Sequence, residues 1–152
     1  MSESRIRRLT PVLDIALEEE RKAAGMLGDC QRQLDDAQAR LRDLEFYASE
    51  YQKGWTQRGQ QGVGRDWLLN YQRFMAQMQT AIEQQQQTVV WYGQSLDKAR
   101  EAWRQRYQRL EAMRKLIERY QQEARLRADK QDQKLLDELS QRAFERTRNN
   151  NS

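Results

Sequence analysis

The sequence predicts an all-α protein, a long two-helix antiparallel coiled-coil hairpin with left-handed supercoiling. Apolar residues recur every seven positions over two long segments, as in the seam of a coiled coil. One glycine-bearing stretch separates the segments, and a single proline in 152 residues leaves long helices uninterrupted. A strict seven-residue repeat underwinds each helix and gives the pair a left-handed twist. The whole chain, residues 1–152, is therefore expected to form one hairpin.

The first helix is predicted over about residues 11–56. Thr10 and Pro11 form a helix-start pattern, because threonine caps free amides and proline suits the first helical position. The seam that follows is apolar except at Glu20. Its a positions are Leu13, Glu20, Leu27, Leu34, Leu41, Ala48 and Trp55, and its d positions are Ala16, Ala23, Cys30, Ala37, Leu44 and Tyr51.

The loop is predicted over about residues 57–65, where glycines interrupt a polar stretch. Asp66 offers an N-cap or a first-turn acid for a second helix, over about 66–144. A frayed tail is expected at 146–152. The a positions of the second seam are Leu68, Met75, Ile82, Val89, Leu96, Trp103, Leu110, Ile117 and Ala124, and the d positions are Tyr71, Met78, Gln85, Tyr92, Ala99, Arg106, Met113 and Tyr120.

The two predicted helices are unequal in length. Counting outward from a turn near Gln61 pairs Pro11 with a position near Glu111, so residues 112–146 are expected to lack a partner within the hairpin. The seam nevertheless stays apolar at Met113, Ile117, Tyr120 and Ala124. A second copy or another protein is expected to cover this stripe.

Charge favours pairing of the two arms and argues against a nucleic-acid partner. Residues 11–56 hold ten acidic and six basic side chains, whereas residues 100–148 hold nine acidic and fourteen basic ones, so the arms attract each other. The overall net charge of +4 is too small to demand a polyanionic partner. Acidic residues also interrupt the basic C-terminal arm throughout, which is typical of a solvated coiled-coil flank.

The residues that enzymes need are sparse. The chain has no histidine, its lone Cys30 falls on the seam, and Gly62-Val63-Gly64 lacks the strand and the Gly-Lys-Ser/Thr ending of a phosphate loop. We therefore expect no enzymatic activity, no metal, no cofactor and no small-molecule substrate. No run of eighteen apolar residues occurs and the N-terminus has no apolar signal region, so a cytoplasmic protein is expected.

Three aromatic residues near the loop fall off the seam. Tyr47 and Phe74 are at g positions, and Phe46 is at an f position. Exposed apolar side chains gathered at one place on a helical hairpin indicate a partner-binding patch. Loose packing around the turn is the competing interpretation.

Several segments resemble the FliJ family of flagellar export proteins. They are residues 47–51 (Tyr-Ala-Ser-Glu-Tyr), residues 67–74 (Trp-Leu-Leu-Asn-Tyr-Gln-Arg-Phe), Ala81-Ile82, Trp91, residues 102–104 (Ala-Trp-Arg), and the C-terminal run 127–143. Members of this family resemble the central stalk of rotary ATPases. The resemblance implies a component of the flagellar type III export apparatus that binds and stimulates a hexameric export ATPase. It also implies contacts with the export-gate membrane protein and with export chaperones, and a peripheral position at the cytoplasmic face of the inner membrane.

The resemblance also implies site residues. The gate-binding surface of the family falls here on Arg40, Leu44, Tyr47, Tyr51, Phe74, Met78, Ala81 and Gln85, of which Arg40 and Gln85 depart from the residue types expected. Contact with the ATPase ring is expected near the termini, at Leu13, Leu17, Met113, Ile117, Tyr120 and Ala124. The isolated protein is expected to be a monomer. Three alternatives remain open: a structural homodimer or scaffold, the stalk of a virulence-type secretion system, and a basic nucleic-acid binder.

Overall fold

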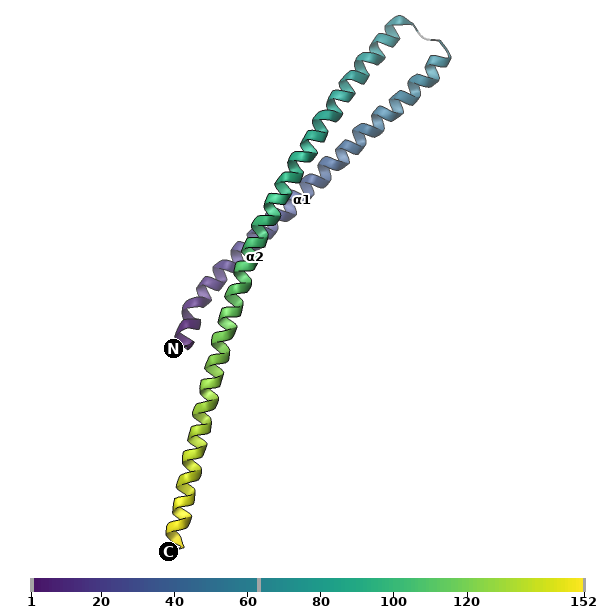
Figure 1. Cartoon of the computed structure of the whole chain (residues 1–152). Coiled ribbons are helices and arrows are strands. Elements are labelled where there is room, and N and C mark those ends of the chain that lie inside the picture. The colour runs from purple at the N-terminus through teal and green to yellow at the C-terminus, as the bar shows by residue number, and fades with distance from the viewer. Residues whose placement is uncertain (1, 63, 152) are drawn as a thin grey trace. The chain divides into compact units, whose positions relative to one another are not determined.

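The protein consists of two long helices, α1 (Ser2–Gln60) and α2 (Arg65–Asn150) (Figure 1). The computed structural model describes residues 2–62 and 64–151, and no strand occurs among them. Val63 and the two ends of the predicted 1–152 domain, Met1 and Ser152, lie outside the described residues. The predicted all-α helical hairpin is confirmed. None of the described helices is long and apolar enough to cross a membrane.

The chain divides into two compact units, each containing a stretch of both helices. The first, here the terminal unit, comprises Met1–Glu20 with Arg106–Ser152. The second, here the loop unit, comprises Arg21–Gln105. In each unit the α1 segment packs antiparallel against the α2 segment, as contacts between early and late residues show.

Helix α1 begins nine residues before the predicted start, so the interpretation of Thr10-Pro11 as a helix start is wrong. Pro11 lies inside the helix, and the Thr10 hydroxyl donates to the Ile6 carbonyl, 2.7 Å away, instead of capping a helix. Ile6 and Leu9 continue the a and d spacing backwards from Leu13, and both are half-buried. The burial of this added seam offsets the backbone hydrogen bond that proline removes.

The other boundaries also lie outside the predicted ranges. Helix α1 ends at Gln60, and Gly62 then adopts φ +84°, a left-handed conformation that glycine reaches without strain. The Leu68 amide donates to the Gly64 carbonyl, and Asp66 lies in the first turn of α2. Helix α2 continues to Asn150, so the predicted fraying from residue 146 is not seen. Its last turn contains Arg148, whose charge favours the C-terminal end of the helix dipole.

The seam of the loop unit follows the predicted heptads. Ala37, Ile82 and Leu96 are its buried residues, and the remaining a and d positions are half-buried except for Tyr51, at 42% exposure. Gln85 occupies a d position in this seam. Its side-chain amide donates to the Ala37 carbonyl over 2.9 Å, so this polar group is satisfied across the two helices.

The terminal unit buries Ala16, Leu110 and Ile117. Residues before the predicted helix start reach far along α2, since the Ser2 hydroxyl lies 3.5 Å from a Glu123 carboxylate oxygen and the Arg5 guanidinium lies 5.3 Å from the centre of the Tyr120 ring. The predicted unpaired stripe at Met113, Ile117, Tyr120 and Ala124 is therefore wrong. The N-terminal extension of α1 covers it, leaving Ile117 only 8% exposed and the other three half-buried.

An unpaired stretch of α2 exists, but it starts later than predicted. Every residue from Arg125 to Asn151 is exposed. The helical part, Arg125 to Asn150, spans about 39 Å at 1.5 Å per residue; we call it the overhang. Its large apolar side chains are Leu126, Leu135, Leu136, Leu139 and Phe144, each at least half exposed.

Candidate functional site: an aromatic groove beside the loop

The last turns before the loop are held together by stacked aromatic rings. Trp55 of α1 stacks on Tyr71 of α2, with ring centres 4.8 Å apart and planes at 18°. Trp67 stacks on the same Tyr71 at 5.9 Å. Farther from the loop the α1 seam uses alanine and cysteine at its d positions. Helix separation depends on the side chains at the contact, so large rings require a wider spacing than alanine does.

A groove lies between α1 and α2 in this stretch. It encloses about 520 Å³ and is lined by five of the eight predicted gate-binding residues together with Glu50. Its floor is the close contact between Tyr51 and Phe74, whose ring centres lie 4.2 Å apart. The five predicted residues are Leu44, Tyr47, Tyr51, Phe74 and Met78.

The prediction that off-seam aromatics near the loop are exposed is confirmed. Tyr47 is 63% exposed and Phe46 is 60% exposed, and their rings contact each other edge to face with centres 6.1 Å apart. Phe74 is 38% exposed, because one side of its ring rests on Tyr51. Tyr47 therefore offers the larger free surface, whereas Phe74 is partly a packing residue.

The other three predicted gate-binding residues do not line this groove. Arg40 is exposed and Ala81 is half-buried. Gln85 is engaged with the Ala37 carbonyl inside the seam, so its amide is already committed to holding the two helices together. Residue spacing places all eight predicted gate-binding side chains on the two helices near the loop. The structure shows which five of them line the groove and which three do not.

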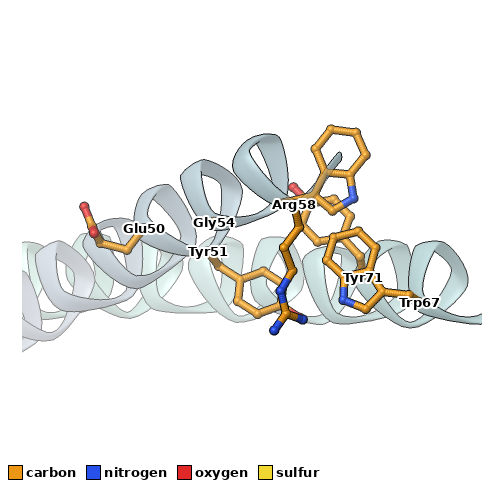
Figure 2. A pocket seen from close by; sticks show the side chains of 7 residues that line it. Glu50, Tyr51, Gly54, Arg58, Trp67 and Tyr71 are labelled. Carbon is orange, nitrogen blue, oxygen red and sulfur yellow. The ribbon is translucent and has the colours of Figure 1, made fainter. Parts of the chain in front are cut away.

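A second hollow lies nearer the loop and was not predicted from the sequence. Its volume is about 250 Å³, and it shares Glu50 and Tyr51 with the groove. Figure 2 shows Glu50 at one end and Trp67 at the other, with Arg58 and the aromatic rings between them. The sequence feature that indicates this second hollow is the pair of tryptophans, Trp55 and Trp67, which flank the glycine loop, one on each predicted helix. The lining residues are Glu50, Tyr51, Gly54, Trp55, Arg58, Trp67 and Tyr71.

The residues predicted to contact an ATPase ring pack within the terminal unit. Leu13, Leu17, Met113, Tyr120 and Ala124 are half-buried, and Ile117 is buried. A partner would reach these side chains only at their edges. The exposed large apolar side chains of this unit lie instead on the overhang, at Tyr107 of α2, and on α1, where Val12 and Ile15 are 42% and 58% exposed.

Charged side chains form ion pairs within and between the helices. Glu19 links the arms of the terminal unit, accepting from Arg106 at 2.9 Å and lying 3.8 Å from Arg109. Other ion pairs join positions three or four apart on one helix, as predicted for solvated flanks. Cys30 is half-buried on the seam. Across the described residues, His, Cys, Asp and Glu side chains nowhere gather in a group of three that could hold a metal ion.

The chain is similar to known proteins over nearly its whole length. The family model described as "Flagellar FliJ protein" matches residues 4–149. The Flagellar FliJ protein of Escherichia coli (strain K12) is 34% identical over 135 residues, which cover 89% of this chain and 92% of that protein. The Flagellar FliJ protein of Salmonella typhi is 33% identical over 135 residues, with the same coverage. The match with the family model includes the aromatic groove, the second hollow and the whole overhang except Asn150.

Proposed function

Because the chain belongs to the flagellar FliJ family, we propose that it is a non-enzymatic stalk of the flagellar type III export apparatus that binds and stimulates the export ATPase ring and contacts the export gate. The family match over residues 4–149 supports a flagellar role. The stalk role rests on what the helices offer to partners. A stalk needs a stable helical pair, surfaces left free for other proteins, and no catalytic centre of its own.

The observation that carries the proposal is the aromatic groove of the loop unit. Tyr47 and Phe46 are more than half exposed at positions where the seam of the hairpin does not need them. A soluble protein rarely leaves neighbouring aromatic rings in water unless a partner covers them, since buried aromatics dominate interface energetics. We assign this groove to the export gate, with Leu44, Tyr51 and Met78 shaping its walls. Export chaperones are further partners of the same protein.

The terminal unit suits the ATPase ring. Its seam, including Leu13, Leu17 and Ile117, keeps the two arms rigidly paired. The overhang then presents a helix that is exposed on all sides, with seven basic and five acidic side chains over residues 125–150. Mixed charge with scattered leucines tolerates contact with several ring subunits better than one continuous apolar face. In this assembly the protein would lie at the cytoplasmic face of the inner membrane.

A pull-down from the native cytoplasm and membrane fraction tests the assignment. The tagged full chain is expected to recover a hexameric ATPase and the gate protein. A second bait, Tyr47→Ala with Phe74→Ala, is expected to recover the ATPase and to lose the gate. Recovery of neither partner by the unaltered chain would contradict the proposal.

The overhang supports one alternative, a structural homodimer. Five large apolar side chains are exposed there, and a second copy could cover them. The N-terminal extension of α1 already covers residues 113–124, which shortens the surface that a dimer would bury. The molecular mass measured by light scattering at several protein concentrations separates the stalk from the structural homodimer. A monomeric mass at micromolar concentration disfavours the homodimer. The flagellar family match favours the flagellar system over the virulence-type one.

A further inference from the structure

We propose that the second hollow, lined by Trp55, Trp67 and Arg58, is an acid-recognising extension of the gate groove, so that the occupant is an acidic peptide segment with an apolar anchor. This inference rests on the proposed contact between the groove and the export gate. It adds the chemistry of the partner: an apolar side chain seated beside Phe74, and a carboxylate placed against Arg58.

The two hollows form one continuous surface because they share lining residues. Glu50 and Tyr51 belong to both. Along α2 the surface runs from Phe74 in the groove to Trp67 in the second hollow, seven residues or about 10 Å at 1.5 Å per residue. A bound segment therefore spans about two turns of helix, with its anchor at one end and its acid at the other.

Arg58 is the free cation of this surface. It lines the second hollow and a third, more polar hollow at the loop, and it makes no ion pair with any residue that the structure describes. Lys53, one turn earlier on α1, differs because its ammonium lies 3.4 Å from Glu50. An unpaired guanidinium beside aromatic rings is suited to a carboxylate, which it can bind through two parallel hydrogen bonds.

Basic side chains slightly outnumber acidic ones around this surface. Residues 44–78, which contain all residues lining the groove and the second hollow, hold the three acidic side chains Glu45, Glu50 and Asp66 against the four basic side chains Lys53, Arg58, Arg65 and Arg73. The Trp55 indole N–H is buried and has no acceptor among the described residues.

Peptide binding to the full chain tests the proposal. The probes are 15-residue peptides tiling the cytoplasmic region of the export-gate protein. Each peptide with acidic residues is paired with a version in which Asp and Glu are replaced by Asn and Gln. Binding is measured by fluorescence anisotropy to the unaltered chain, to Arg58→Glu and to Arg73→Glu. Arg73 is the matched control, because it is an exposed arginine of the loop unit that lines none of the three hollows.

We expect at least one acidic peptide to bind, and its amide version to bind about tenfold more weakly. Arg58→Glu is expected to reduce affinity about tenfold. Arg73→Glu is expected to reduce it less than threefold, because Arg73 lines none of the hollows and adds only a solvent-exposed charge that salt screens. A peptide with Lys in place of the acid should regain affinity for Arg58→Glu. Circular dichroism should be the same for all three proteins, since Arg58 is exposed and unpaired.

Equal losses in the two arginine variants, equal binding of acidic and amide peptides, or no binding by any peptide would overturn the inference. So would concentration-dependent self-association that Arg58→Glu abolishes, because the occupant would then be a second copy.

The gate assignment itself is tested separately by Tyr47→Ala with Phe74→Ala. If that double variant no longer binds the gate region while Arg58→Glu still binds it, the proposed recognition of an acidic segment is wrong and the proposed function stands. If the aromatic variant also retains binding, the proposed function fails.

Discussion

Replacing Leu110 with alanine should destabilise the terminal unit, whereas the same change at Leu136 on the same helix should not. Leu110 is only 2% exposed and Leu136 is 60% exposed. The substitution removes three carbon atoms. At about 0.8 kcal/mol for each buried carbon, the loss at Leu110 is about 2.4 kcal/mol before any cavity term, within the range of about 2–5 kcal/mol for buried leucines. At Leu136 the loss should stay within about 0.5 kcal/mol.

Urea unfolding followed by circular dichroism measures both effects. The midpoint should fall for Leu110→Ala and stay unchanged for Leu136→Ala, with similar slopes for both. If Leu136→Ala lowers the midpoint as much as Leu110→Ala, the overhang is packed against something in solution, and the description of an unpaired helix is wrong. Repeating the titration at two protein concentrations then shows whether the covering surface is a second copy, because only a dimer has a concentration-dependent midpoint.

Three further changes probe the groove, the overhang and the proline. Tyr47→Ala with Phe74→Ala should weaken gate binding by about 2 kcal/mol or more, with only a modest loss of thermal stability from the Tyr51–Phe74 contact; melting as early as that of Leu110→Ala would show that the pair belongs to the core. Leu136→Ser with Leu139→Ser should reduce ATPase stimulation without loss of helicity or gate binding, and unchanged stimulation would remove the overhang from the ring contact. Pro11→Ala should raise the melting temperature, because it restores a helix-interior hydrogen bond and removes the clash of the proline ring, effects that together amount to up to about 3 kcal/mol; no gain would favour a helix start at Pro11.

Heptad spacing predicted the fold because a seam is a local, periodic property. The a and d positions chosen from the sequence are the buried or half-buried positions of the structure, with Tyr51 and Arg106 as the exposed members. Arg106 tolerates its d position by pairing with Glu19 across the helices. Unequal arms followed from counting residues outward from the turn, and exposed aromatics near the loop followed from their g and f positions in the heptads.

Boundaries and site membership did not follow from local signals. Thr10-Pro11 has the residues of a helix start, but the apolar stripe around Ile117 offers burial to Ile6 and Leu9, and this tertiary contact overrides the local preference. Likewise, Gln85 has the spacing of a groove residue. Gln85 was predicted both at a d position of the seam and on the gate-binding surface, and the small side chain of Ala37 leaves a backbone carbonyl within reach, so only the seam position holds. Both outcomes depend on which residues face each other across the hairpin.

Phosphate release by the cognate export ATPase, measured with and without this chain, tests the proposed stalk role most directly. The purified chain alone should release no phosphate. Added to the ATPase, it should raise the rate, and the Tyr47→Ala with Phe74→Ala variant should raise it equally, because those residues belong to the groove and not to the terminal unit. An unchanged ATPase rate would contradict the stalk role, and phosphate release by the rigorously purified chain alone would contradict its description as a non-enzymatic partner.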